Sequence, residues 1–430
     1  MTADSTVVIR PARNLAGSLG LPGDKSISHR YAMLGAIAQG ATKLRNFSTG
    51  ADCASTLGCL KTLGVEWERT DGAVVIQGRG AKLRPPASAL DCGNSGSTMR
   101  MLSGILAGQE FASELMGDES LSERPMARII TPLAAMGARI TARDGGRPPL
   151  RVAGGGLKAI DYQMPVPSAQ VKTSLLFAGL FADGETRVEE RVRTRDHGEL
   201  ALRAFGAEVR RQQNEVRIAG GQKLRAIEAA IPGDPSSAAF FFCAAALFPD
   251  SKLMIGELLM NPTRARLLDL LISMGLGISI TQLEEEHGEL RGTVQVEGRS
   301  LQGTTIAGAD TAALIDEIPV LAAIAPYTTG GIEIRDAREL RVKESDRIRA
   351  VARNLQAMGA EVEEREDGLK IPGGQKLRGA EIDSFGDHRI AMAFAVAGLR
   401  AEGETTIRGA DRAVISFPAF FEILESLLER

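Results

Sequence analysis

Residues 21–30 read Leu-Pro-Gly-Asp-Lys-Ser-Ile-Ser-His-Arg, and an alanine-rich stretch follows directly. Pro-Gly-Asp ends any preceding strand, and Asp24 or Ser26 can cap a helix over the alanine-rich stretch. Lys25 and Arg30 then lie in or near the first turn, where the helix dipole disfavours cations. One such turn is usually a solvated surface feature, but a cation at a helix N-terminus also suits an anion site. Recurrence of the pattern favours the anion site.

The chain repeats one pattern along its length. A helix end, a glycine and an alternating hairpin recur at intervals of 69 to 84 residues, at Gly64, Gly137, Gly206, Gly275 and Gly359. Each glycine is predicted to follow a helix C-terminus. A polar signature that opens a helix rich in Ala, Leu and Gly occurs six times, near Gly23, Gly93, Pro167, Gly233, Asp316 and Gly386. The sequence therefore predicts six α/β units.

The sixth unit is incomplete, because six signature helices are followed by only five hairpins. Two unassigned strands at 6–21 are expected to complete it, and the chain is expected to end in a helix over 417–428. This closure predicts two lobes of three units, one formed by residues 23–232 and the other by residues 1–22 plus 233–430. The two Pro-Gly-Asp crossings suit a hinge, and a ligand cleft between lobes is the default expectation.

Composition excludes several classes of protein. The 430 residues are 44% apolar, enough for the cores of two to three domains, and the net charge of −3 argues against a nucleic-acid or anionic-membrane binder. We expect no signal peptide, and the longest apolar run, 238–248, is too short to span a bilayer. Four cysteines without a CxxC pair indicate reduced thiols in a cytoplasmic protein without a metal site.

Two glycine- and serine-rich signatures resemble anion sites. Residues 91–100, Asp-Cys-Gly-Asn-Ser-Gly-Ser-Thr-Met-Arg, and residues 167–172, Pro-Ser-Ala-Gln-Val-Lys, open apolar helices whose first N–H groups lack partners. Each signature alone is weak, but together with Lys25 and Arg30 they predict a phosphate-bearing ligand. Asp24 stands where a Walker A loop has glycine, and no GxGxxG follows a strand, so nucleotide loops are not expected.

Further charged residues are expected at helix starts. Residues 341–347, Arg-Val-Lys-Glu-Ser-Asp-Arg, are predicted to open an amphipathic helix with Lys343 and Arg347 on one face, although a solvated charged helix is the alternative. Asp316 precedes an apolar helix and can be a cap or a general base. Arg124 and Pro125 are expected in the start of another helix.

His388 and Arg389 are expected to open the last signature helix. His388 can be a general acid, a metal ligand or a structural residue, and the lack of a second nearby histidine disfavours a metal.

At these motifs the chain resembles the 5-enolpyruvylshikimate-3-phosphate synthases, within the enolpyruvyl transferase family. The resemblance covers nearly the whole chain, and its motifs in the family's order are PGDKSISHR, GNSGSTMR, GDESLSERPM, PSAQVK, RVKESDR and GDHRIAM. It implies a two-lobed inside-out α/β barrel, with three β-α-β-α-β-β units in each lobe. It also implies a monomer that needs no metal or organic cofactor. The implied reaction transfers the enolpyruvyl (carboxyvinyl) group of phosphoenolpyruvate to the 5-hydroxyl of shikimate 3-phosphate and releases phosphate.

The resemblance also implies roles for individual residues. Shikimate 3-phosphate would be bound by Lys25, Ser26, Arg30, Ser168, Ala169, Gln170, Thr194, Arg195, Asp316 and Lys343. Phosphoenolpyruvate would be bound by Lys25, Gly96, Arg124, Gln170, Arg347 and Arg389. Asp316 would accept the hydroxyl proton, Glu344 would assist proton transfer at the methylene carbon, and Lys25 would touch both substrates. Two substrates that each carry a phosphate and a carboxylate require such a set of cations and helix N-termini, which we expect both lobes to supply.

Three positions bear on specificity. Ile415 stands where many members have lysine before the Ser-Phe-Pro segment, and His197 stands where some have tyrosine. Gly96 leaves room for phosphoenolpyruvate and, by resemblance, for the inhibitor glyphosate.

Two other functions are alternatives. One is the sister enzyme that transfers the same group to UDP-N-acetylglucosamine, which uses a Lys-Asn pair near its start and a loop cysteine, for which Cys92 is the candidate here. The other is a non-catalytic, repeat-built binding protein.

Overall fold

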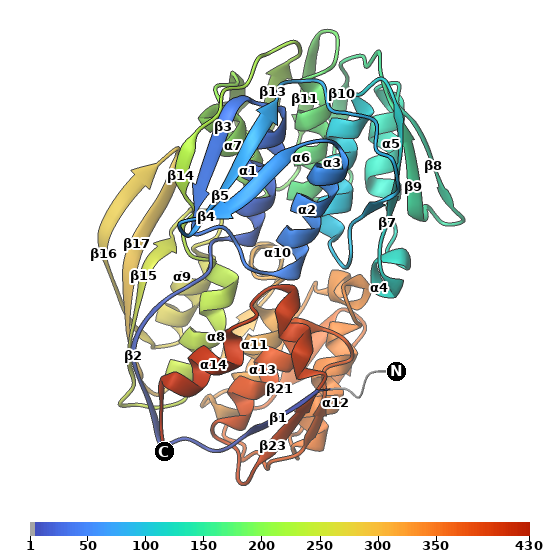
Figure 1. The fold of residues 1–430 in the computed structure, drawn as a ribbon. Coiled ribbons are helices and arrows are strands. Elements are labelled where there is room, and N and C mark those ends of the chain that lie inside the picture. Colours follow the sequence, from blue (N-terminus) through green and yellow to red (C-terminus); the bar gives the residue numbers. More distant parts are fainter. Residues whose placement is uncertain (1–4) are drawn as a thin grey trace. The chain divides into compact units, whose positions relative to one another are not determined.

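The computed structural model describes residues 5–430, and the chain divides into two compact units (Figure 1). Unit 1 comprises the described residues up to Pro22, with Pro232–Glu284 and Leu290–Arg430, and unit 2 comprises Gly23–Ile231 and Glu285–Glu289. The expected boundaries differ from this division at Pro232 and at the hairpin turn Glu285–Glu289. The turn belongs to unit 2 because its residues bond there, as the His287 ring does to the Glu228 carbonyl.

The described part of unit 2 forms three four-stranded sheets with one shared topology. In each sheet a first strand pairs parallel with the second, which pairs antiparallel with the hairpin. The sheets are β14 (Glu228–Ala230), β3 (Gln39–Arg45), β5 (Ala73–Arg79), β4 (Glu66–Thr70); β6 (Leu90–Asp91), β7 (Ala112–Met116), β9 (Arg147–Ala153), β8 (Arg139–Arg143); and β10 (Asp161–Gln163), β11 (Glu185–Glu189), β13 (Glu215–Ala219), β12 (Val209–Gln212). The helices are α1 (Lys25–Ile37), α2 (Ala51–Thr62), α3 (Gly96–Ala107), α4 (Glu119–Ser122), α5 (Ala127–Ala135), α6 (Ala169–Gly179) and α7 (His197–Ala204).

The described part of unit 1 holds the other three sheets. They are β16 (Gly277–Glu286), β17 (Glu289–Glu297), β15 (Lys252–Leu259), β2 (Asn14–Gly20), β24 (Leu428–Glu429); β18 (Thr304–Ile306), β19 (Ile332–Ile334), β21 (Gly368–Ile371), β20 (Glu363–Arg365); and β1 (Thr6–Ile9), β23 (Thr405–Arg408), β22 (Glu381–Asp383). The helices are α8 (Pro235–Ala246), α9 (Arg266–Ser273), α10 (Ala309–Ala313), α11 (Ile318–Ile324), α12 (Arg347–Ala357), α13 (His388–Gly398) and α14 (Phe420–Ser426), with the 3₁₀ helices η1 (Ala325–Tyr327), η2 (Arg338–Val342) and η3 (Ala410–Ile415). Six related units are thus present, as predicted.

The two ends of the chain depart from expectation. Strand β1 completes the sixth sheet by pairing with β23, but β2 pairs parallel with β15 in the fourth sheet. The chain start therefore serves two units, whereas the sequence predicted that it completes only the sixth. The last helix is shorter than predicted, because the chain turns back after Ser426 and ends in β24 against β2.

The signature helices form the interior of each unit. Most of their residues are buried, and in α8 every residue from Pro235 to Ala246 is buried, as expected for a helix without a polar face. In unit 2, α1, α3 and α6 lie among the sheets (Figure 1). The five glycines predicted to follow helix ends have φ values between 81° and 108°, which is the left-handed region that glycine adopts at a helix C-terminus.

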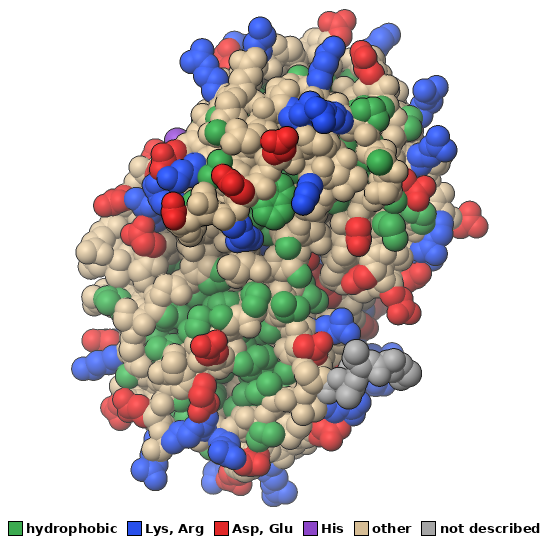
Figure 2. Space-filling view, in the orientation of Figure 1, with side chains coloured by type: hydrophobic (Ala, Val, Ile, Leu, Met, Phe, Trp, Pro, Cys, Tyr) green, Lys and Arg blue, Asp and Glu red, His purple; other side chains and the backbone are tan. Residues whose placement is uncertain are grey.

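The surface carries charges of both signs. On the face drawn in Figure 2, basic and acidic side chains are interspersed, and hydrophobic side chains gather over the region of α8, α11 and α14. Within residues 5–430, the length and apolar character that a bilayer-crossing helix needs do not occur together in any helix.

Candidate active site

In unit 2, the start of α1 presents its cations as predicted. The Asp24 carboxylate caps the helix by accepting a hydrogen bond from the Ile27 N–H at 2.8 Å, so α1 begins at Lys25. The Lys25 ammonium lies 2.9 Å from the carboxylate of Asp52 on α2. Lys25 keeps 18% of its side chain exposed, whereas Asp52 keeps 8%. The pair thus orients an ammonium group that solvent or a ligand can still reach.

Arg30 lies one turn further along α1 and is buried. Its guanidinium donates to the Thr173 hydroxyl at 2.9 and 3.2 Å and to the Ser26 carbonyl at 2.8 Å. The pKa of Arg30 is lowered to about 10, chiefly by burial and also by Arg195, while nearby carboxylates oppose the shift. Arg30 is therefore charged at neutral pH and has a second cation close by, which favours an anionic ligand.

The starts of α3 and α6 are joined by one side chain. Both helices start within the stretches that the sequence predicted, with Ser95 as the cap of α3 and Ser168 as the cap of α6. Gln170 accepts a hydrogen bond from Arg100 Nη1 at 2.8 Å and donates one to the Ser97 hydroxyl at 2.8 Å. Two helix N-termini, both sources of N–H groups for anions, are thereby held together.

Arg124 lies beside the first of these helices. It donates to the Asn94 side chain at 2.8 Å and to the Ser120 hydroxyl at 3.0 Å. A Cβ atom at Gly96 would lie 3.6 Å from Arg124 Nη1 and 2.9 Å from Arg100 Nη1. Space beside two guanidinium groups is therefore kept open by glycine.

The predicted helix start at Arg124 and Pro125 is wrong. Helix α5 begins at Ala127, with Met126 as its N-cap residue, and Arg124 lies after the short helix α4. Pro125 therefore precedes the helix instead of occupying its first turn.

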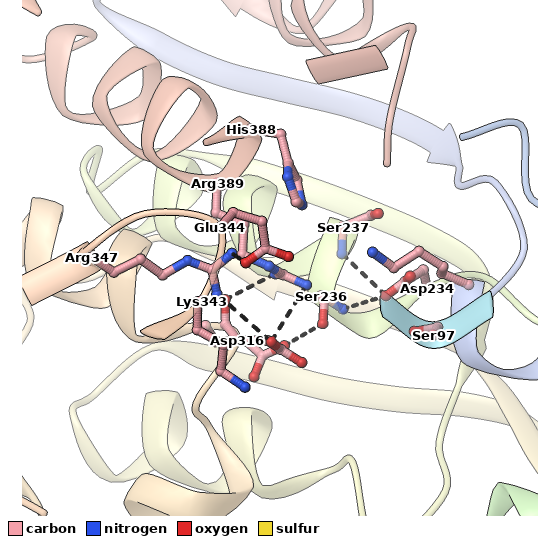
Figure 3. A network of polar contacts seen from close by, with 12 residues as sticks. Ser97, Asp234, Ser236, Ser237, Asp316, Lys343, Glu344, Arg347, His388 and Arg389 are labelled. Atoms are coloured by element: carbon pink, nitrogen blue, oxygen red, sulfur yellow. Dashed lines mark hydrogen bonds and ion pairs between the residues drawn. The ribbon is translucent and has the colours of Figure 1, made fainter. Parts of the chain in front are cut away.

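In unit 1, Asp316 faces two arginines. Its Oδ1 lies 3.9 Å from Arg347 Nη1 and 3.8 Å from Arg389 Nη2, and its carbonyl accepts a hydrogen bond from Arg389 at 2.9 Å (Figure 3). The N-cap residue of α11 is Glu317. The interpretation of Asp316 as a helix cap is therefore wrong. Its carboxylate lies near two cations and is 21% exposed, which is compatible with the alternative, a general base.

Arg347 is the centre of this group. Only 1% of its side chain is exposed, and it donates to both carboxylate oxygens of Asp387, at 2.8 and 3.3 Å, and to Glu344 at 2.6 Å. Within the described chain its Nη1 has no hydrogen-bond partner. Burial alone would raise the pKa of Asp387, but the charge and hydrogen bond of Arg347, together with nearby His388, lower it. The Nη1 atom of Arg347, which faces Asp316 at 3.9 Å, is therefore available to donate to a ligand.

Lys343 is not placed as predicted. Helix α12 begins at Arg347, because the Asp346 carboxylate caps it by accepting from the Arg349 N–H at 3.1 Å. Lys343 follows η2, outside the helix, and pairs with Glu339 at 3.0 Å. It therefore shares neither the first turn nor a helix face with Arg347.

Helix α13 begins at His388, as predicted, and Asp387 caps it. His388 is buried, and within residues 5–430 no cluster of histidine, cysteine and carboxylate side chains could hold a metal ion.

Sequence reasoning missed several site residues. Asp52 gave no local signal, because its pairing with Lys25 spans 27 residues. Arg100 could have been found, since it lies four residues after Gly96 and so on the same helix face. Asp387 was recognised only as part of a helix start, and its second role as the partner of Arg347 needs the folded chain.

The family model for EPSP synthase (3-phosphoshikimate 1-carboxyvinyltransferase) matches residues 9–424. The chain belongs to the EPSP synthase family. Among its relatives, a 3-phosphoshikimate 1-carboxyvinyltransferase of Koribacter versatilis is 62% identical over 99% of this chain and 100% of the relative. One of Solibacter usitatus is 57% identical over 98% of this chain and 99% of the relative. An EPSP synthase structure from Acinetobacter baumannii matches with a TM-score of 0.87 and 41% identity over 98% of both chains.

The family assignment confirms the predicted fold class and does not support the two alternatives. Cys92 also does not fit the loop cysteine of the sister enzyme. It is buried, and a hydrogen bond with Cys59, followed by burial, raises its pKa well above the ordinary value. Such a thiol is unreactive.

Two departures from EPSP synthase sequences have structural consequences. Ile415 is buried in η3, so this position supplies no cation. His197, at the position of a tyrosine in some members, is also buried, and its Nδ1 lies 2.6 Å from the Glu289 carboxylate.

Proposed function

We propose that this chain transfers the enolpyruvyl group of phosphoenolpyruvate to the 5-hydroxyl of shikimate 3-phosphate and releases phosphate, a step of chorismate and aromatic amino acid biosynthesis. Membership of the EPSP synthase family over residues 9–424 supports the reaction. The observation that carries the assignment to residues is the placement of Asp316, whose carboxylate lies within 4 Å of two guanidinium groups.

Asp316 acts as the base in this proposal. It removes the proton from the 5-hydroxyl, the oxygen attacks C2 of phosphoenolpyruvate, and a proton adds to the C3 methylene carbon. Loss of phosphate and of a proton from C3 then restores the double bond. Glu344, bonded to Arg347 and partly exposed, assists the proton transfers at C3, and Lys25 contacts both substrates.

The remaining residues bind the anionic groups. In unit 2, the partly buried Ser168, Ala169 and Gln170 at the start of α6, with Arg30, bind shikimate 3-phosphate. Further contacts to this substrate come from Ser26, Thr194, Arg195 and Lys343. Phosphoenolpyruvate is bound by Gly96, Arg124, Gln170, Arg347 and Arg389. Several charge-assisted hydrogen bonds of this kind hold each substrate and stabilise charge that develops during the reaction.

We further propose that the protein is a cytoplasmic monomer that glyphosate inhibits. The four cysteines are buried free thiols, which suits a reducing compartment. Glycine at position 96 places no side chain beside Arg124 Nη1, and we expect the inhibitor's anionic group to bind there.

The deciding assay measures phosphate release from phosphoenolpyruvate by the purified chain. Release is expected with shikimate 3-phosphate, and not when UDP-N-acetylglucosamine replaces it or when no acceptor is added. The Asp316→Ala variant is expected to lose turnover while still binding shikimate 3-phosphate. A wild-type chain that releases no phosphate with shikimate 3-phosphate refutes the proposal.

A further inference from the structure

Four charged side chains form a closed cluster inside unit 2. Lys172 Nζ lies 3.0 Å from Glu190 Oε2 and 2.9 Å from Glu199 Oε1. Arg211 contacts the same two oxygen atoms, at 3.1 and 2.7 Å. The side chains of Lys172, Glu190 and Glu199 are at most 1% exposed and that of Arg211 is 14% exposed. Two cations and two carboxylates thus balance in charge away from solvent.

Stability alone does not account for such a cluster. Removing four charges from water is costly, and well-packed apolar side chains of similar volume are often as stable or more so. A charged cluster does fix the relative positions of the segments that carry it, because each carboxylate must stay in contact with both cations. The cluster joins α6, the residue after β11, α7 and β12, which are four separate segments of unit 2.

The second oxygen of Glu190 connects the cluster to a proposed substrate contact. Glu190 Oε1 accepts hydrogen bonds from the Thr194 N–H, at 3.1 Å, and from the Thr194 hydroxyl. The segment between Glu190 and Thr194 is therefore folded around this carboxylate. Arg195 follows directly and lies near enough to Arg30 to influence its ionisation.

The other end of the cluster also adjoins the proposed site. Lys172 lies in the first turn of α6, and its N–H donates to the Ser168 carbonyl at 3.0 Å. The next residue, Thr173, accepts the two hydrogen bonds from Arg30. The cluster thus contacts two segments that the proposed function assigns to the binding of shikimate 3-phosphate, the first turn of α6 and the segment that ends in Thr194 and Arg195.

We propose that Lys172, Glu190, Glu199 and Arg211 act as positioning residues that hold Thr194 and Arg195 in place for the phosphate group of shikimate 3-phosphate. The inference rests on the proposed function. Without the Lys172 charge, two buried carboxylates would share only Arg211. Glu190 would then reorient or take up a proton, and Thr194 would lose a fixed, charged acceptor.

The first test replaces Lys172 by methionine, which has nearly the same length and no charge. Lys172→Met is expected to raise the KM for shikimate 3-phosphate roughly 10- to 100-fold, the equivalent of one hydrogen bond to a charged group. The KM for phosphoenolpyruvate and kcat at saturation are expected to stay within about threefold of wild type. The matched control is Arg187→Met on β11, because Arg187 pairs with Asp161, Glu189 and Glu215, outside the cluster. This control is expected to leave both KM values unchanged.

The second test restores the charge balance. In Lys172→Met/Glu199→Gln, one carboxylate again faces one cation, so Glu190 is expected to return to Arg211 and the KM for shikimate 3-phosphate to recover to within about threefold of wild type. Wild-type affinity in Lys172→Met, or an equal loss for both substrates, would overturn the inference. If the single variant does not fold, the double variant decides, and weakened binding by its folded form overturns the inference. Absence of activity in the wild type would instead refute the proposed function.

Discussion

Gly96→Ala tests whether the space beside the two guanidinium groups is a binding site for phosphoenolpyruvate. The added methyl carbon would lie 2.9 Å from Arg100 Nη1 and 3.6 Å from Arg124 Nη1. The first distance is too short for a carbon contact, so the end of the Arg100 side chain must move. The second is an ordinary contact, and the methyl group would fill the space that a phosphate or carboxylate oxygen needs next to Arg124.

The size of the effect follows from these contacts. Moving Arg100 weakens its 2.8 Å hydrogen bond to Gln170, and covering Arg124 weakens one charge-assisted contact to the substrate. One hydrogen bond that involves a charged group contributes about 1.5–3 kcal/mol, so the KM for phosphoenolpyruvate should rise roughly 10- to 100-fold. Inhibition by glyphosate should weaken at least as much, because this ligand is longer than phosphoenolpyruvate and has less room to shift. The fold should be little affected, since a flexible side-chain end is all that must move.

Steady-state phosphate release at saturating shikimate 3-phosphate measures the KM for phosphoenolpyruvate, and competition measures the inhibition constant for glyphosate. The matched control is Gly58→Ala, because Gly58 lies in α2 and, apart from its chain neighbours and the backbone of its own helix, no atom lies within 4 Å of its would-be Cβ. That control should keep both constants and gain about 0.5–1 kcal/mol of stability from the loss of a helix glycine. A KM in Gly96→Ala within twofold of wild type would show that the space beside Arg124 is not used by the substrate.

Three further predictions concern charge. Asp316→Asn should lower kcat by about 10²- to 10⁴-fold with small changes in both KM values, as measured by phosphate release, and a loss below tenfold would remove Asp316 as the base. Asp387→Asn should lower the free energy of unfolding at pH 7 by about 3–5 kcal/mol in urea titrations, because Arg347 would be buried without its main partner. The pKa of Asp387 is lowered in the folded chain, so this stability is present above about pH 4 and is lost as the pH falls through the folded-state pKa; an unchanged acid limb in the variant would contradict this. Burial, and after it the two nearby cations Lys25 and Arg30, lower the pKa of His29 in the folded chain. The His29 imidazole therefore stays neutral in the folded chain, whereas in the unfolded chain it takes up a proton below about pH 6.5. Wild-type stability should therefore fall by up to about 1.4 kcal/mol per pH unit below that point, and His29→Gln, if the reasoning holds, should show a shallower slope.

The sequence predicted those features that depend on neighbouring residues. The starts of α1, α3 and α6 were located within the predicted stretches, because the Asp or Ser that caps each helix bonds an N–H only three residues ahead. The five glycines after helix ends were located for the same reason. The α12 start was misplaced because residues 341–347 offer more than one charged candidate, and only the Asp346 cap bond selects the register.

Features that depend on contacts between residues far apart in the chain could not be predicted from the sequence. The pairing of β2 with β15 joins residues more than 230 positions apart, and nothing local in β2 distinguishes the fourth sheet from the sixth. The same holds for the contact of Lys172 with Glu199 and for that of Arg347 with Asp387. Resemblance supplied the names of site residues, but not which carboxylate holds which cation.

The cations at the helix starts also have a clearer explanation than the sequence allowed. A cation in the first turn was expected to be unfavourable unless a bound anion compensates it. In the structure Asp24 and Asp387 cap the two helices, while Lys25 pairs with Asp52, so these helices begin without a ligand. The Arg389 guanidinium lies 3.8 Å from the Asp316 carboxylate. Asp387 has two separable roles, since it caps α13 and also binds Arg347 through both oxygens. Asparagine caps a helix about as well as aspartate but carries no charge, so a loss of stability in Asp387→Asn with an intact α13 would assign the cost to the arginine pair and not to the cap.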